Sequence, residues 1–157
     1  MVEQKTLNLL VVSSNLTRIT DKCLKIVDIY LHFLAKSQRE KTTLNFYTES
    51  DLVEFDYLPD PDCYISIEQL GKRTIRYFIE VVNPDSNKYE RVQLVKKYLE
   101  YLDEGTWKKA TGYLFPTILL YCPDQKTKHS LDKYLEETIY EEYEMEKKCI
   151  INLVLQP

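Results

Sequence analysis

Apolar and polar positions follow two rhythms along this chain, one helical and one extended. From residue 16 to about residue 36, apolar side chains recur at spacings of three and four residues, which predicts an amphipathic helix. Three runs rich in β-branched and aromatic residues follow and predict strands at residues 42–47, 63–67 and 74–82. Because Gly71-Lys72 supplies a turn between the last two runs, we expect a short β-meander.

The second half of the chain predicts alternating helices and strands. Asn83-Pro84-Asp85-Ser86 ends the third strand and offers a helix cap, and the helical pattern of residues 89–102 stops at Gly105. The order α-β-β-β-α-β-α-β is completed by a strand at 114–122, a helix from Pro123-Asp124 to about residue 140, and a strand at 149–155. The connection between residues 82 and 114 is of crossover length, which favours an α/β fold with a mixed sheet flanked by helices.

The helix at 89–102 also predicts which lysines approach the sheet. At about 100° per residue its aliphatic side chains form one stripe with a tyrosine at the border, namely Val92, Val95, Leu99, Leu102 and Tyr98. Lys88 falls on the side of this stripe and Lys96 flanks it, whereas Lys97 points roughly the opposite way. Lys88 and Lys96 are therefore the predicted lysines on the sheet side.

Composition adds limits on the class of protein. The 157 residues contain no Gly/Ser-rich linker or internal repeat, so we expect a single domain over residues 1–157. The cysteines are widely spaced and never form a C-x-x-C pair, which is typical of buried thiols in a reducing compartment; they are Cys23, Cys63, Cys122 and Cys149. We expect a cytoplasmic protein, because no apolar run has the length of a membrane span and no signal-peptide pattern opens the chain.

The net charge of −4 restricts nucleic-acid binding. Proteins that hold duplex DNA tightly on their own usually show a basic footprint, so any DNA contact here should be weak, local or assisted by a protein partner. Much of the acid lies in residues 136–146, whose consecutive carboxylates lack the spacing of a coordination loop. We expect that segment to be a solvated helix end and loop.

Two acidic residues carry the candidate chemistry. Glu80 lies inside the apolar run 77–82, and a buried carboxylate is normally neutralised, paired or bound to a cation. Asp62 opens the preceding strand, so the two acids are expected at the same end of adjacent antiparallel strands. Mg²⁺ or Mn²⁺ on such a pair points to phosphodiester chemistry. The alternative is a solvated turn aspartate beside an ion-paired strand glutamate.

This arrangement resembles the core of the PD-(D/E)XK nuclease-like fold. The features that carry the resemblance are the order of helices and strands, Pro61-Asp62 at the start of one strand and Glu80 near the end of the next. More narrowly, the chain is similar to the replication-relaxation family of plasmid and mobile-element proteins; the stretches that carry this similarity are Pro61-Asp62-Cys63-Tyr64, Tyr77-Phe78-Ile79-Glu80-Val81, residues 91–102, Gly105-Thr106-Trp107 and Phe115-Pro116. The resemblance implies that Asp62 and Glu80 are metal-binding acids.

The chain departs from these families in two ways. Val82 stands where the superfamily carries its lysine, two residues after the glutamate. In related folds the following helix supplies a lysine, and Lys88 is then the first candidate and Lys96 the second. Members of the replication-relaxation family tend to carry a winged-helix segment before this core, and the roughly fifteen residues ahead of the predicted first helix are too few for one.

Three functions stay open from the sequence. The favoured one is a catalytically silent nuclease-like module that serves as an accessory factor in replication or conjugative processing of mobile DNA, together with protein partners. The second is a Mg²⁺-dependent DNA endonuclease that uses Asp62, Glu80 and Lys88. The third is a protein-interaction module unrelated to DNA, which the thirteen tyrosines favour because tyrosine is enriched at interfaces.

Overall fold

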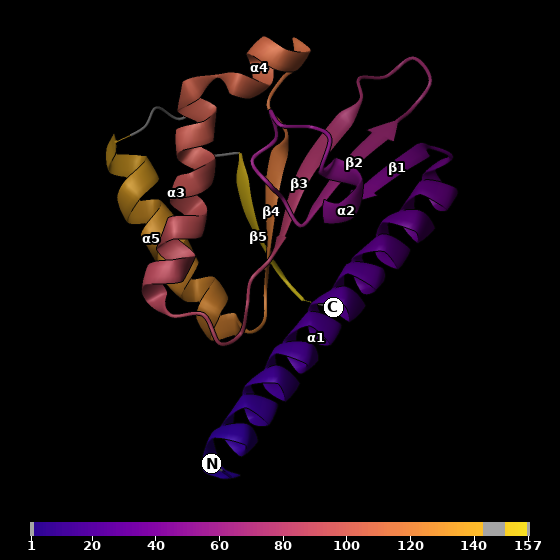
Figure 1. Cartoon of the computed structure of the whole chain (residues 1–157). Coiled ribbons are helices and arrows are strands. Elements are labelled where there is room, and N and C mark those ends of the chain that lie inside the picture. The colour runs from indigo at the N-terminus through magenta and orange to yellow at the C-terminus, as the bar shows by residue number, and fades with distance from the viewer. Residues whose placement is uncertain (1, 143–149, 157) are drawn as a thin grey trace.

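The computed structural model describes residues 2–142 and 150–156, and it contains one five-stranded sheet in the order β1-β2-β3-β4-β5 (Figure 1). The strands are β1 (Thr43–Thr48), β2 (Cys63–Glu68), β3 (Ile75–Val81), β4 (Thr117–Cys122) and β5 (Ile151–Leu155). The helices are α1 (Val2–Glu40), α2 (Glu49–Leu52), α3 (Lys88–Glu104), α4 (Thr106–Thr111) and α5 (Gln125–Glu142).

The sheet is mixed, as the sequence predicted. Strands β1, β2 and β3 pair antiparallel and form the expected meander, while β4 pairs parallel with β3 and β5 pairs parallel with β4. The two parallel steps are made by crossovers, through α3 and α4 between β3 and β4 and through α5 between β4 and β5. The α/β class with helices flanking a mixed sheet is therefore confirmed.

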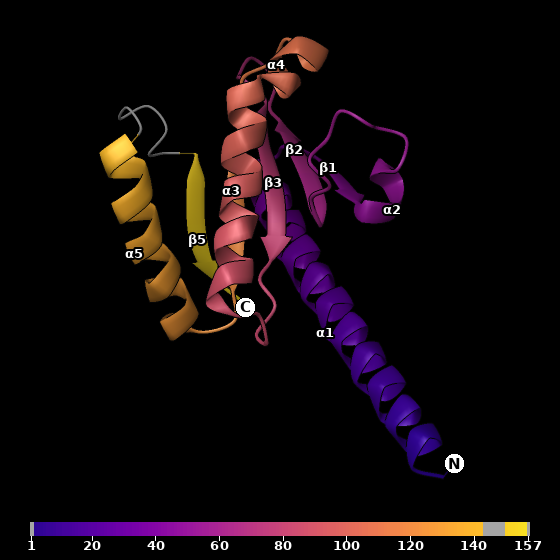
Figure 2. The ribbon, with the colours of Figure 1, turned by 60° about the vertical axis from the view of Figure 1, so that its left-hand side comes forward.

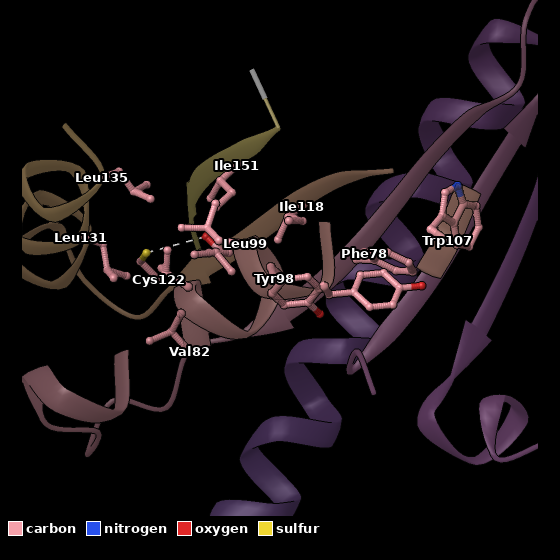
Figure 3. Packing of buried hydrophobic residues seen from close by; sticks show 13 residues of the cluster. Phe78, Val82, Tyr98, Leu99, Trp107, Ile118, Cys122, Leu131, Leu135 and Ile151 are labelled. Atoms are coloured by element: carbon pink, nitrogen blue, oxygen red, sulfur yellow. Dashed lines mark hydrogen bonds between the residues drawn. The ribbon is translucent and has the colours of Figure 1, made fainter. Parts of the chain in front are cut away.

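Helices cover both faces of the sheet (Figure 2). On one face, Ile29 and Phe33 of α1 pack in a cluster with Ile65 and Ile79. On the other face, α3 and α5 cover the centre of the sheet, where Figure 3 shows Phe78 and Tyr98 between Trp107 at one end of the cluster and Leu131 and Leu135 of α5 at the other. Strands β1 and β2 extend past the helices of this second face.

Local sequence signals fix the ends of α3. Asn87 accepts a 3.0 Å hydrogen bond from the Glu90 backbone N–H, and the Glu90 carboxylate accepts one from the Asn87 N–H at 2.9 Å, which makes a capping box. Gly105 ends the helix in the left-handed region, at φ 65°, where a residue without a Cβ is favoured. This helix is the element that carries the lysines expected near the acids.

The first helix is much longer than the sequence pattern predicted. It begins at Val2 rather than near residue 16 and spans 39 residues, roughly 60 Å at about 1.5 Å per residue. Its N-terminal half extends past the sheet (Figures 1 and 2). Short helices α2 and α4 were also not predicted, and β4 begins at Thr117 because the preceding residues, including Pro116, form no strand ladder.

The predictions for the cysteines and for the acidic segment hold in part. Cys63 and Cys122 are buried thiols as predicted, but Cys23 is exposed, and Cys149 lies outside the described residues. Glu136 and Glu137 are exposed, whereas the end of the acidic segment, from residue 143, also lies outside them. Within residues 2–142 and 150–156, no helix combines the length and apolar character needed to cross a membrane.

Candidate acid and lysine site at the ends of β2 and β3

The two predicted acids meet at the same end of adjacent antiparallel strands. Asp62 immediately precedes β2, and the register that pairs Cys63 with Ile79 brings Asp62 opposite Glu80. Side chains of directly opposite residues share one face of a sheet, with Cβ atoms about 4.5–5.5 Å apart. A hydrogen bond of 2.8 Å from the Val81 backbone N–H to Asp62 Oδ2 holds the aspartate against β3.

Both carboxylates are buried. Asp62 is 7% exposed and Glu80 is 6% exposed, so neither is a solvated surface acid. Glu80 Oε1 accepts two short hydrogen bonds, one of 2.7 Å from the Lys97 ammonium and one of 2.6 Å from the Tyr98 hydroxyl. Lys97 also donates to the carbonyl of Asp60 at 3.3 Å, which ties α3 to the loop that leads into β2.

Burial and the neighbouring Asp62 charge raise the pKa of Glu80 to about 7. The charge and hydrogen bond of Lys97 and the hydrogen bond of Tyr98 oppose this shift but do not cancel it. A carboxyl group with this pKa changes its charge around neutral pH, whereas an ordinary glutamate is ionised there. Burial, together with the charge of Glu80, also raises the pKa of Tyr98 well above its usual value, so its hydroxyl remains a donor.

Asp62 has its own cation, which comes from the other face of the sheet. Its Oδ1 forms an ion pair with the ammonium of Lys22 on α1. Burial alone would lower the pKa of Lys22, but the hydrogen bond and charge of Asp62 outweigh it and raise that pKa. The charge of Glu80 acts in the same direction. Two carboxylates and two ammonium groups therefore gather at this end of the sheet.

The prediction about the lysines of α3 was wrong. Lys97, which the helical wheel pointed away from the sheet, is the lysine bonded to Glu80. Lys88 is exposed at the first residue of α3, and among the described ion pairs it makes none with Asp62 or Glu80. Lys96 is exposed too.

The reason for this error lies in the tyrosines of α3. The wheel was centred on aliphatic residues, but Tyr98 is 0% exposed and Tyr101 is 8% exposed, so the buried face is turned toward them. Lys97 lies one turn before Tyr101, at the border of this face, and its ammonium reaches Glu80. The Tyr101 hydroxyl is satisfied by the Tyr57 carbonyl at 2.7 Å, which makes its burial possible.

The sequence reasoning also missed Lys22 and Tyr98 as parts of the site. Neither has a local signal, since Lys22 is one of many helix lysines and Tyr98 is one of thirteen tyrosines. Both become visible as partners only when α1 and α3 are placed on opposite faces of the sheet.

The site offers few oxygen ligands for a metal ion. Within the part of the chain that the structure describes, no group of three or more His, Cys, Asp or Glu side chains gathers to hold a metal. Two carboxylates are nevertheless the usual protein contribution to a Mg²⁺ site, where water and substrate phosphate supply the remaining ligands. Asp62 and Glu80 are the residues that would hold such an ion.

An open groove of about 840 Å³ adjoins the site on the α1 side. It is lined by α1 and by the segment that follows β3, and Lys22 belongs both to this groove and to the ion pair with Asp62. Its charged side chains are of mixed sign, namely Arg18, Lys22, Lys25, Asp21, Asp28 and Asp85. Lys22 is thus the residue that links this groove to the acid pair.

Comparison with known proteins assigns the chain to no family. No family model, curated protein or solved structure matches the chain.

Proposed function

We propose that this chain is a DNA-processing domain with a nuclease-like site, in which Asp62, Glu80 and Lys97 support Mg²⁺- or Mn²⁺-dependent phosphodiester cleavage. The observation that carries the proposal is the 2.7 Å contact of the Lys97 ammonium with Glu80, opposite Asp62. Lys97 supplies from α3 the cation that Val82 cannot supply from β3. The proposal includes the PD-(D/E)XK-like fold and the narrower likeness to the replication-relaxation proteins of plasmids and mobile elements.

Each residue has a distinct part in this proposal. Asp62 and Glu80 hold the divalent cation, which supplies charge stabilisation at the scissile phosphate when it is bound. Lys97 orients a water molecule and stabilises negative charge on the phosphate oxygens. Tyr98 is a positioning residue, since its hydroxyl fixes Glu80 Oε1 at 2.6 Å. Glu80 must be ionised to hold the cation, which its pKa of about 7 permits above neutral pH.

A second candidate is the catalytically silent accessory factor, and the ion pair between Lys22 and Asp62 favours it. With Lys22 on one acid and Lys97 on the other, both carboxylates are neutralised without a metal. A domain of this kind would act through protein partners of a DNA-processing complex and hold DNA weakly on its own, in keeping with its net charge of −4.

Metal titration and cleavage assays on one set of variants separate the two candidates. Calorimetry with Mn²⁺ should detect one site that disappears in Asp62→Asn and Glu80→Gln. The protein should also cut single-stranded or duplex DNA in Mn²⁺, and Lys97→Ala should abolish cutting while the matched Lys96→Ala does not, because Lys96 is exposed on the same helix. Absence of both rejects the nuclease-like site and supports the silent module, whose acids are neutralised by the lysines. Metal binding without cleavage rejects the catalytic role proposed for Lys97.

A further inference from the structure

A cavity of about 410 Å³ lies on the face of β1 and β2 that α3 and α5 leave uncovered. Side chains of β1, β2 and β3 form its floor, and α2, the segment after it and α4 form its walls. Its lining includes Asn45, Tyr47, Tyr64, Glu68, Arg76 and Tyr113. None of them belongs to the acid and lysine site.

Aromatic rings form much of the cavity wall. Tyr47 and Tyr64 stack with centroids 5.8 Å apart and planes 25° from parallel, and the Tyr64 ring lies 5.9 Å from that of Trp107. At another part of the wall, the Arg76 guanidinium lies 3.9 Å from the centroid of the Tyr113 ring. Flat apolar faces and a stacked guanidinium are the surfaces on which proteins place planar heterocycles.

The polar side of the cavity is rich in hydrogen-bond acceptors. The Asn45 amide nitrogen donates to Ser66 Oγ at 3.2 Å and to Glu68 Oε1 at 3.1 Å. A carboxylate only accepts hydrogen bonds, so this contact fixes the orientation of the Asn45 amide. With its two N–H groups engaged, Asn45 presents its carbonyl oxygen, and Glu68 has a second carboxylate oxygen. A ligand that fits this side must bring N–H donors.

We propose that this cavity binds the base of an unpaired nucleotide and prefers bases that carry an exocyclic amino group, namely cytosine, adenine and guanine. The base stacks on the tyrosine rings, and its amino group donates to Asn45 and Glu68. The inference rests on the proposed function in one respect, that the ligand is a nucleic acid. Tyr64 follows Asp62 by two residues, so the cavity and the acid pair share one face of the sheet.

The single tryptophan makes the cavity directly observable. Trp107 is 3% exposed, and its indole N–H donates to the Leu114 carbonyl at 2.9 Å, so its emission reports on the rings packed against it. The full-length chain is titrated with CMP and with UMP in metal-free buffer. CMP and UMP differ at position 4, where CMP has an amino group and UMP an oxygen, and at N3, which accepts a hydrogen bond in CMP and donates one in UMP. We expect a saturable change in tryptophan emission with CMP. UMP should bind about tenfold more weakly, because one hydrogen bond to the site is lost.

Two variants at exposed positions test the assignment without disturbing the core. Glu68→Gln places a donor on the acceptor side and should remove the preference for CMP, while Tyr113→Ala should weaken both nucleotides; Glu100→Gln, exposed on α3, is the control and should change neither. No saturable change up to about 10 mM, equal affinity for CMP and UMP, or unchanged binding in both variants would overturn the inference.

The outcome is separable from that of the proposed function. Nucleotide binding that persists in Glu80→Gln, in a protein that neither binds Mn²⁺ nor cuts DNA, supports the cavity and rejects the nuclease-like site. Mn²⁺ binding and cleavage without any CMP binding rejects the cavity and leaves the acid and lysine site intact.

Discussion

The Lys97 ammonium and the Glu80 carboxylate are 2.7 Å apart, and this contact joins the centre of α3 to the end of β3. The side chain of Glu80 is 8% exposed and that of Lys97 is 37% exposed, so the acid is buried and the lysine reaches it from the solvent side. The site is therefore partly built from a helix and not only from the sheet.

Replacing Lys97 by methionine should lower the free energy of unfolding by about 1–2 kcal/mol. Breaking a fully buried pair costs more, but Lys97 is more than a third exposed and Glu80 can take up a proton, so the penalty is reduced. Urea unfolding at pH 8 measures this loss of stability. Lys96→Met on the same helix should change stability by less than about 0.5 kcal/mol. Equal effects of the two substitutions would show that the contact with Glu80 contributes nothing.

The stability of the protein should fall as pH rises through the range set by Glu80. Its pKa is raised from 4.5 to about 7 in the folded state, so between these values the folded chain holds a proton that the unfolded chain releases. The stabilisation of the folded state by this proton is complete below pH 4.5 and is lost as pH rises past about 7. The total change in the free energy of unfolding is on the order of 3 kcal/mol.

Comparison of the wild-type chain with Glu80→Gln isolates this contribution, because the amide cannot titrate. The difference in unfolding free energy between the two proteins should change in favour of the variant from pH 4 to pH 8. A difference that stays constant over that range would mean that the folded-state pKa of Glu80 is ordinary.

Tyr98→Phe should destabilise the protein and raise the pKa of Glu80 further. The substitution keeps the ring, which is 0% exposed, but removes the 2.6 Å hydrogen bond to Glu80 Oε1. The expected loss is about 1–3 kcal/mol at pH 8, where the carboxylate is ionised, and less at pH 5, where it is protonated. Thermal unfolding at the two pH values tests this, with Tyr89→Phe at an exposed position as control. A pH-independent effect would contradict a role for the hydroxyl at Glu80.

Lys22→Ala should strengthen Mn²⁺ binding by up to about tenfold, because the ammonium of Lys22 competes with a metal for Asp62. Lys36→Ala on the same helix is the control and should leave the affinity unchanged. Calorimetric titration at pH 8 gives both values. If Mn²⁺ binds more weakly in Lys22→Ala than in the control, Lys22 supports the metal site and does not compete with it.

The sequence alone determined the secondary structure of the sheet and the position of the acids. Runs rich in β-branched and aromatic residues at the β1, β2 and β3 positions, a turn at Gly71, and a helical pattern that stops at Gly105 are local signals, because they depend on backbone sterics. The N-cap of α3 was predicted within residues 83–86, and the structure places it at Asn87. Asp62 and Glu80 were predicted at one end of adjacent strands because an antiparallel pair places a strand start beside a strand end.

The tertiary structure decided which side chains join them. Angular spacing on α3 fixes how far Lys97 lies from Tyr98, but not which face of the helix is buried, and a tyrosine can be buried or exposed. Packing of Tyr98 and Tyr101 against the sheet turned Lys97 toward Glu80. Lys22 reached Asp62 only because α1 lies on the opposite face and meets the end of the sheet, a relation between residues far apart in sequence that no local pattern encodes.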